Sequence, residues 1–191
     1  MPAERRPNRG PSAAAENRAA LMAAAREVFA TAGYEAPLST VAREAGVGQG
    51  SLYRHFPDRI SLALAVFEES VAELEALAAT PGSTLDDVLT VITEQTIAST
   101  AFITMVSVPD RPDPRVIEVR DRVARVLEGK LPQARAAGRV RADVTADDLV
   151  LVVGMLASLL SKLPAPERVV TAGRLWDLLR RGIDGAAARR G

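Results

Sequence analysis

The side chains best suited to chemistry in this 191-residue chain are concentrated between residues 49 and 59. Those with hydrogen-bonding groups are Gln49, Ser51, Tyr53, Arg54 and His55. No acidic residue occurs among them before Asp58, whereas a helix that faces only solvent normally carries both signs of charge. Glutamine can pair with the edge of adenine, and tyrosine and arginine can reach phosphates. The pattern therefore favours a surface that binds nucleic acid.

The segment around these residues has the spacing of a helix-turn-helix motif. Residues 37–56 read PLSTVAREAGVGQGSLYRHF, which predicts a two-turn helix over 38–45, a tight turn at Gly46 and a second helix over 49–56. Gly46 suits the positive φ that such a turn requires. The apolar residues expected where the two helices meet are Val41, Ala42, Val47 and Leu52. An ordinary corner between two helices has the same spacing, so the spacing alone leaves both interpretations open.

Two glycines begin the second helix of this motif. Gly48 stands at the cap, where glycine is tolerated, and Gly50 lies in the first turn. A glycine inside a helix costs about 1 kcal/mol relative to alanine. Close approach to a DNA backbone is one benefit that would offset this cost. The alternative is that a glycine in the first turn is barely penalised.

Helical periodicity runs through the rest of the chain, and no segment shows the sustained alternation of a half-buried strand. We therefore predict an all-α fold with about nine helices. The further helices are expected at residues 14–32, 58–79, 84–99, 102–106, 116–137, 145–163 and 166–187. Thr84 with Asp87 and Thr145 with Asp148 have the spacing of capping boxes, which mark helix starts. Pro132 is expected to kink or restart the helix that contains it.

The composition excludes several classes of protein. Apolar residues make up 48% and charged residues 25%, with 24 basic and 24 acidic side chains, so the chain is neither a disordered tail nor a polycation. It has no cysteine, a single histidine (His55) and no glycine-rich phosphate loop. We therefore expect no enzymatic activity, no metal site and no cofactor. Capping explains the acidic pairs Asp86–Asp87 and Asp147–Asp148 more simply than catalysis does.

No segment predicts export or insertion into a membrane. Residues 1–12 contain Arg5, Arg6 and Arg9, but no apolar stretch follows that would form the core of a signal peptide. The most apolar run, residues 149–160, is about twelve residues long, whereas spanning a bilayer needs roughly 20. We therefore expect a cytoplasmic protein with no membrane partner.

The motif and its flanks resemble a known family. The sequence GVGQGSLYRHFPDR, preceded by STVAREA and by FATAGYEA, is similar to the DNA-binding domain of the TetR family of bacterial transcriptional regulators. The resemblance is strong over residues 17–73 and only architectural over the remainder. It implies a helix-turn-helix domain of three helices, and a fourth helix that connects this domain to a ligand-binding and dimerising domain.

The resemblance assigns DNA-binding roles one position at a time. The residues placed against base edges in the major groove are Gln49, Gly50 and Ser51. The residues placed against phosphates or a thymine methyl group are Tyr53 and His55. Phosphate is also the expected partner of Arg59. The residues expected to contact the DNA backbone from the preceding helix are Ser39 and Thr40.

Two departures from the family's pattern concern the ends of these helices. Gly48 stands where a serine or threonine often caps the recognition helix, and Pro37 begins the preceding helix, where proline is acceptable. Two other interpretations stay open. His55 would also suit a place packed between helices, and Tyr53 would also suit a partly buried place with an exposed hydroxyl group.

A single recognition helix covers too few base pairs for genomic selectivity, so we expect a homodimer on a palindromic operator. Two-fold symmetry would place the two recognition helices about 34 Å apart, or a multiple of that distance. The last two predicted helices are the expected dimer surface, because the first of them is apolar on more than one face. The alternative is a helix fully buried within a monomer. The predicted interface residues are Leu149, Val152, Val153, Leu156, Leu159, Leu160, Val169, Gly173, Trp176, Leu179 and Ile183.

The resemblance also implies a pocket for a small-molecule effector among the middle helices, where binding would alter the tilt of the fourth helix. Aromatic residues make up only 4% of the chain, which favours a modest apolar cavity. The predicted lining residues are Phe67, Val71, Ile92, Gln95, Phe102, Met105, Val106 and Met155. For each of them an ordinary place in the core is the alternative.

We therefore expect three parts along the chain. They are a disordered basic tail at 1–13, a helix-turn-helix DNA-binding domain at 14–60, and an effector-binding and dimerisation domain at 61–191. An arm in the minor groove is the alternative for the arginines of the tail. The predicted function is that of a dimeric repressor, which releases a double-stranded DNA operator when a small apolar effector binds. A helical scaffold that binds only proteins is the alternative.

Overall fold

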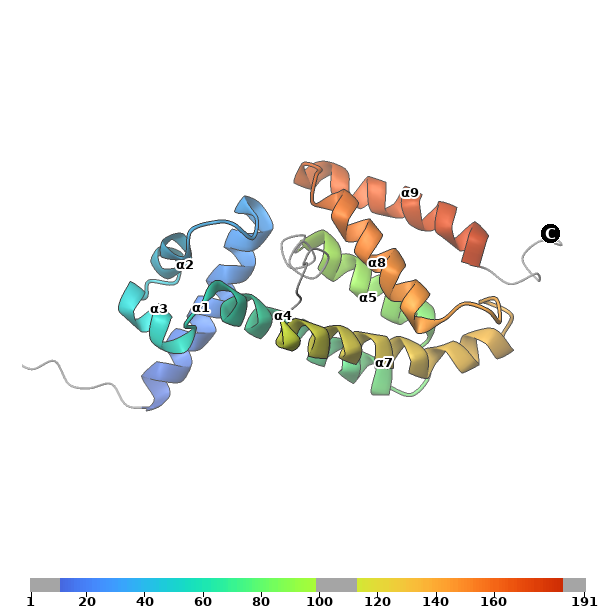
Figure 1. Cartoon of the computed structure of the whole chain (residues 1–191), viewed down its shortest axis with the longest axis horizontal. Coiled ribbons are helices and arrows are strands. Elements are labelled where there is room, and N and C mark those ends of the chain that lie inside the picture. Colours follow the sequence, from blue (N-terminus) through green and yellow to red (C-terminus); the bar gives the residue numbers. More distant parts are fainter. Residues whose placement is uncertain (1–10, 99–112, 184–191) are drawn as a thin grey trace, which may run out of the picture.

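The computed structural model describes residues 11–98 and 113–183 of the chain. Within these ranges it contains eight α-helices and no strand (Figure 1). The helices are α1 (Pro11–Ala32), α2 (Leu38–Glu44), α3 (Gln49–His55), α4 (Arg59–Ala79), α5 (Leu85–Ala98), α7 (Pro114–Ala136), α8 (Ala146–Leu160) and α9 (Ala165–Ile183). The prediction of an all-α fold is confirmed. The helix predicted at 102–106 lies outside the described residues.

The described helices differ from the predicted ones mainly in α1, α7 and α8. α1 begins at Pro11, so the last three residues of the predicted tail are helical; residues 1–10 lie outside the described part of the chain. α7 continues through Pro132 as one helix to Ala136, and the predicted restart does not occur. A proline removes a single backbone hydrogen bond, and buried Leu131 and Ala134 hold the helix on either side of it. α8 ends at Leu160, three residues earlier than predicted.

Helices α1, α2 and α3 form one end of the molecule around an apolar core (Figure 1). The turn between α2 and α3 closes with Gly46 at φ +65°. The amide of Gly46 donates to the carbonyl of Arg43 (3.1 Å), and the amide of Val47 donates to the carbonyl of Ala42 (2.9 Å). These two hydrogen bonds form the C-terminal motif that favours glycine. They fix the angle between the two helices, as the helix-turn-helix spacing predicts.

Helix α4 leads from this end of the molecule to the other (Figure 1). It begins with a capping box, in which the amide of Ser61 donates to Asp58 Oδ1 (2.6 Å) and the amide of Asp58 donates to Ser61 Oγ (3.2 Å). Its first half contributes Leu62 and Val66 to the core around α1–α3. Its second half contributes Leu74 to a separate core with α5, α7 and α8. One rigid element therefore belongs to both ends.

Ion pairs and caps hold the second end together. Arg122 on α7 donates two hydrogen bonds to Glu75 on α4, at 2.9 and 2.7 Å, and these bonds lower the pKa of the Glu75 carboxyl. The predicted capping boxes are both present: the amide of Asp87 donates to Thr84 Oγ1, and α8 begins with the reciprocal pair of Thr145 and Asp148. The first turns of α5 and α8 are therefore both stabilised by local capping hydrogen bonds, as the sequence predicts.

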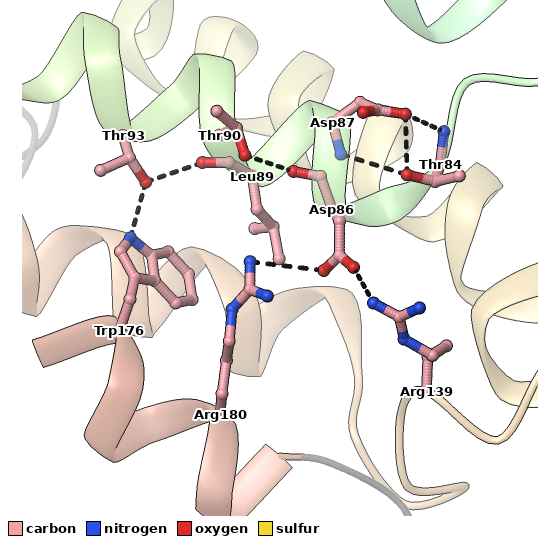
Figure 2. Close-up of polar contacts among 9 residues, drawn as sticks. All are labelled: Thr84, Asp86, Asp87, Leu89, Thr90, Thr93, Arg139, Trp176 and Arg180. Atoms are coloured by element: carbon pink, nitrogen blue, oxygen red, sulfur yellow. Dashed lines mark hydrogen bonds and ion pairs between the residues drawn. The ribbon is translucent and has the colours of Figure 1, made fainter. Parts of the chain in front are cut away.

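Polar contacts attach the inner face of α9 to α5 (Figure 2). The indole nitrogen of Trp176 donates to Thr93 Oγ1 at 2.6 Å. Asp86, in the first turn of α5, accepts from Arg139 and also pairs with Arg180 of α9 (3.5 Å). Ala172 of α9 is buried in an apolar cluster with Leu156 and Leu160 of α8. One face of α9 therefore packs within the protomer, against α5 and α8.

Candidate nucleic-acid interface and adjoining cavity

The second helix of the motif, α3, presents a polar surface to solvent. Leu52 and Phe56 turn inward and are 1% and 2% exposed. Gln49 and Arg54 are exposed, and Tyr53 is 52% exposed, so Tyr53 does not belong to the core. Figure 1 shows α3 at the end of the molecule opposite α9. The surface is therefore free of the chain's other described elements.

The remaining predicted DNA-binding residues border this surface. Ser39 is exposed on α2, and Thr40 is half-buried behind it. Ser51 and His55 are half-buried on α3, where the ring of His55 lies 6.4 Å from the ring of Phe56. His55 thus packs partly against its neighbour and remains partly accessible. The DNA contacts of all these residues stay predictions.

Gly50 lies in open space on this surface. A Cβ atom built at Gly50 would have no heavy atom of the described chain within 4 Å. Its φ is not positive, so the backbone does not require glycine there either. The same absence of a neighbour holds at Gly48. The protein's own fold therefore does not explain the glycine at position 50.

Arg59, the predicted phosphate contact at the start of α4, is engaged within the protein. Its Nη1 donates to the carbonyls of Tyr34 and Ala36, the latter at 2.5 Å. Its guanidinium lies 5.4 Å from the centre of the Tyr34 ring. Arg59 thereby ties α4 to the turn between α1 and α2. The sequence gives no sign of this contact, because it joins residues that are more than twenty positions apart.

A cavity of about 320 Å³ lies beside this tie, between α1 and helices α4, α5, α7 and α8. Four of the predicted pocket residues line it: Phe67, Val71, Ile92 and Gln95. Phe102, Met105 and Val106 lie outside the described residues. Met155 was wrongly predicted, because it does not line the cavity and is 57% exposed. The lining residues that the sequence did not reveal include Phe29, Ala30, Tyr34, Val150, Val153 and Gly154.

The predicted dimer surface requires a correction at α8. Leu149, Leu156 and Leu160 are at most 1% exposed inside the protomer, so they cannot meet a partner. Val153 lines the cavity. The exposed apolar residues of α8 are Leu151, Met155 and Leu159, of which only Leu159 was predicted. The prediction assigned the buried side of α8 to the partner. Both sides of this helix are apolar, and only tertiary packing determines which one is buried.

The predicted interface residues of α9 fall into different environments. Val169 (62% exposed) and Gly173 are exposed, as a contact with a partner requires. Trp176 was wrongly predicted, because its indole is directed into the protomer against α5. The half-buried predicted residues are Val152 of α8 and Leu179 of α9, and the side chain of Ile183 is not described. The exposed apolar residues of α9 that the prediction missed are Val170 and Leu178.

The described residues contain neither a metal-binding cluster nor a membrane-spanning helix. No group of three or more histidine, cysteine, aspartate or glutamate side chains there is placed to hold a metal ion. None of the described helices combines the length and the apolar character needed to cross a membrane.

The sequence and the structure are similar to known regulators. A sequence model of the family described as bacterial regulatory proteins, tetR family, matches residues 21–66. A TetR transcriptional regulator from Streptomyces coelicolor is 30% identical, over 88% of this chain and 99% of that chain, with a TM-score of 0.59. CprB, a TetR family protein from S. coelicolor A3(2), is 20% identical over 93% of each chain, with a TM-score of 0.67. A gamma-butyrolactone receptor described as ArpA-like is 23% identical, over 93% of this chain and 92% of that chain, with a TM-score of 0.58. No curated protein matches the sequence significantly.

The likenesses to CprB and to the gamma-butyrolactone receptor show the fold. The 30% identity to the S. coelicolor regulator extends over nearly the whole of both chains, and the matched segment at 21–66 contains the helix-turn-helix. The family consists of transcription regulators, not of enzymes. The chain belongs to the TetR family of bacterial transcriptional regulators and is a DNA-binding regulator of transcription.

Proposed function

We propose that this regulator is a cytoplasmic homodimeric repressor, which binds a palindromic operator and releases it when a small apolar molecule fills the cavity. The DNA-binding domain comprises residues 14–60 and the effector-binding and dimerisation domain residues 61–191. The bases are read by Gln49, Gly50 and Ser51. Phosphates are held by residues around them, including Tyr53. The helix N-terminus of α3 adds a partial positive charge at the same place.

The cavity is the observation that carries the ligand-dependent part of this proposal. Its volume of about 320 Å³ is near the lower end of the range of roughly 300–1,000 Å³ that is usual for ligand sites. Its charged lining residues, Arg26, Glu27 and Arg120, are largely exposed, and the residues between them are mostly apolar. A small, uncharged and mostly apolar molecule suits such a lining. The gamma-butyrolactone receptor that shares the fold is a receptor for a small molecule of this general kind.

Release by an effector requires that the effector bind one conformation better than the other. A shift of the population from 1:99 to 99:1 needs roughly 5.5 kcal/mol of differential binding. The cavity is bounded both by α1 of the DNA-binding domain and by α5, α7 and α8 of the other domain. A movement between the domains would therefore change its shape and its affinity for a ligand.

The exposed apolar residues of α8 and α9 support the homodimer. They are Leu151, Met155 and Leu159, whose spacing places them on one side of α8, and Val170 and Leu178, whose spacing places them on one side of α9, together here called the α8–α9 apolar face. Apolar residues that gather on an exposed face mark interaction sites in soluble proteins. Packing this face against its symmetry mate would bring together two helices from each protomer, which is an isologous contact.

The full chain and a library of fragmented genomic DNA test the proposal. We expect the bound fragments to share a sequence with two-fold symmetry, and two protomers to sediment with each short duplex that carries it. Enrichment of a sequence without symmetry, bound by one protomer, would contradict the dimeric repressor. The absence of any enriched sequence would contradict operator binding itself.

A further inference from the structure

Tyr34 differs from the other residues that line the cavity. The other lining residues belong to helices α1, α4, α5, α7 and α8, whereas Tyr34 lies in the turn between α1 and α2. Its ring also contacts Phe29, with a centroid distance of 5.9 Å. Residues within a helix are held by hydrogen bonds on both sides, but a turn is a connection that can shift. A molecule in the cavity would therefore displace this part of the wall most easily.

The turn that contains Tyr34 leads directly into α2, the first helix of the helix-turn-helix. Ala36 of the turn is buried in the core around α1–α3, and α2 begins two residues later at Leu38. On the other side, Arg59 of α4 donates to the carbonyls of Tyr34 and Ala36 and lies against the Tyr34 ring. Both hydrogen bonds use Nη1. No described residue accepts a hydrogen bond from Nη2 or Nε of Arg59, and these atoms are the ones left for a phosphate.

We infer that Tyr34 is the positioning residue through which a molecule in the cavity acts on DNA binding. A ligand that presses on the ring of Tyr34 shifts the turn, moves the guanidinium of Arg59 with it, and removes Arg59 from its phosphate. The inference rests on the proposed function, because it takes the cavity as the effector site and Arg59 as a phosphate contact. It adds a direct route from the cavity to the DNA surface, alongside any tilt of α4.

The chemistry around Tyr34 also restricts the ligand. Burial raises the pKa of the Tyr34 hydroxyl, so the group stays protonated and can donate to a neutral oxygen of a ligand. Gln95 and Thr96 provide the other polar side chains on the α5 wall. Gln95 Nε2 already donates to the carbonyl of Ser70 (3.1 Å), and Thr96 Oγ1 donates to the carbonyl of Ile92 (2.7 Å). An apolar molecule with a carbonyl or ether oxygen directed at Tyr34 fits this arrangement.

A substitution that fills the cavity beside Tyr34 replaces the unidentified ligand in the test. Ala30→Leu adds three carbons on α1, at a half-buried residue that lines the cavity. Ala32→Leu is the matched control, because it adds the same atoms on the same helix at an exposed residue outside the cavity lining. The DNA probe is the most enriched genomic duplex. The measurements are the dissociation constant and its dependence on salt concentration.

We expect Ala30→Leu to weaken binding at least fivefold, which is the lower range of allosteric effects. We also expect it to reduce the slope of log K against log salt by about 1.8, the value of two lost phosphate contacts, one from each protomer of the dimer. Arg59→Gln should reduce this slope by the same amount. The double variant with Ala30→Leu and Arg59→Gln should bind no more weakly than Arg59→Gln alone. Tyr34→Leu provides a second variant if Ala30→Leu fails to fold, and Tyr34→Phe should recover most of what Tyr34→Leu loses.

Other results would overturn the inference. Equal effects of Ala30→Leu and Ala32→Leu would show that the cavity beside Tyr34 is not involved. Losses from Ala30→Leu and Arg59→Gln that multiply would show that the two residues act independently. If the wild-type chain enriches no duplex at all, the proposed operator binding itself is wrong. This outcome is distinguishable from the two outcomes above, which both require that the wild-type chain bind a duplex.

Discussion

Two exposed helical faces of this molecule differ in their chemistry. The outer face of α3 carries Gln49, Tyr53 and Arg54, with no acidic side chain on the helix. The α8–α9 apolar face carries residues such as Leu151 (63% exposed) and Val170 (65% exposed). A polar surface without acids suits the hydrated, negatively charged grooves of DNA. An apolar surface gains stability only by leaving water, so it suits another protein surface.

The buried faces of the same helices are alike. Leu52 anchors α3 and Leu156 anchors α8, and both are 1% exposed. The comparison therefore separates two properties of a helix. Its inner face fixes it to the protomer by apolar packing in either case, and its outer face determines which class of molecule it can bind.

The largest expected effect comes from a charge on the α8–α9 apolar face. Met155→Glu should convert the proposed dimer to monomers, because a carboxylate at a 57% exposed residue is harmless in a monomer and unfavourable in an apolar contact. Operator affinity should fall about 100-fold or more, since a dimer doubles the contacts of one recognition helix. Sedimentation measures the oligomer, and binding to the enriched duplex measures the affinity.

Two controls sharpen this experiment. Gln133→Glu adds the same charge at an exposed residue of α7 and should leave the protein dimeric. Leu156→Glu places the charge in the protomer's core and should unfold the chain, with a loss of helical signal. A Met155→Glu protein that sediments as wild type does would show that the α8–α9 apolar face is not the dimer contact.

The two regions also differ in how far the sequence predicts them. The helix-turn-helix was predicted with its turn and its inward residues, because the signals are local: Gly46 ends α2, and Leu52 follows at the spacing of a short second helix. The capping box of Asp58 and Ser61 at the start of α4 was also local but was missed. An aspartate three residues before a serine was the available signal.

The cavity and the exposed side of α8 depend on contacts between distant residues, so the sequence alone could not predict them. α8 is apolar on two stripes, and the choice of the stripe with Leu156 as the inner one follows from its packing with α9 in one cluster. Tyr34 lines the cavity because the turn after α1 lies near α4, and no periodicity contains that information. Patterns of residues close together in the sequence predict individual helices. A cavity lined by several helices forms only when the chain folds, so these patterns do not predict it.

Single substitutions on α3 should weaken operator binding by about tenfold each. Gln49→Ala removes a side chain predicted to pair with a base edge, and such a contact contributes roughly 1–3 kcal/mol of discrimination. Tyr53→Ala should reduce affinity for all duplexes alike if the hydroxyl contacts phosphate. Binding to the enriched duplex and to one altered base pair distinguishes the two. Unchanged affinity in both variants would remove α3 from the DNA surface.

Gly50→Ala should give a smaller loss of affinity without a loss of stability. The added Cβ meets no atom of the described protein, and alanine favours a helix over glycine by up to about 1 kcal/mol. The melting temperature should therefore stay the same or rise, while binding to the enriched duplex falls a few-fold if DNA approaches the helix backbone at Gly50 as proposed. Equal or stronger binding by Gly50→Ala would indicate that the glycine is simply tolerated in the first turn.

The smallest expected effect concerns the inner face of α9, where the indole nitrogen of Trp176 donates to Thr93 Oγ1 at 2.6 Å. Thr93→Val keeps the shape of the side chain and removes the acceptor, which should lower the free energy of unfolding by about 1 kcal/mol. For a chain of this size that loss corresponds to a melting temperature about 2–4 °C lower.

The proposed dimer should persist in Thr93→Val, because the indole of Trp176 is directed toward α5 within the protomer. Trp176 is the chain's single tryptophan, so its fluorescence reports the change of environment without interference. A Thr93→Val variant that melts as wild type does but sediments as a monomer would contradict this assignment. The side of α9 with Trp176 would then contact the partner, and the opposite side would stabilise the protomer.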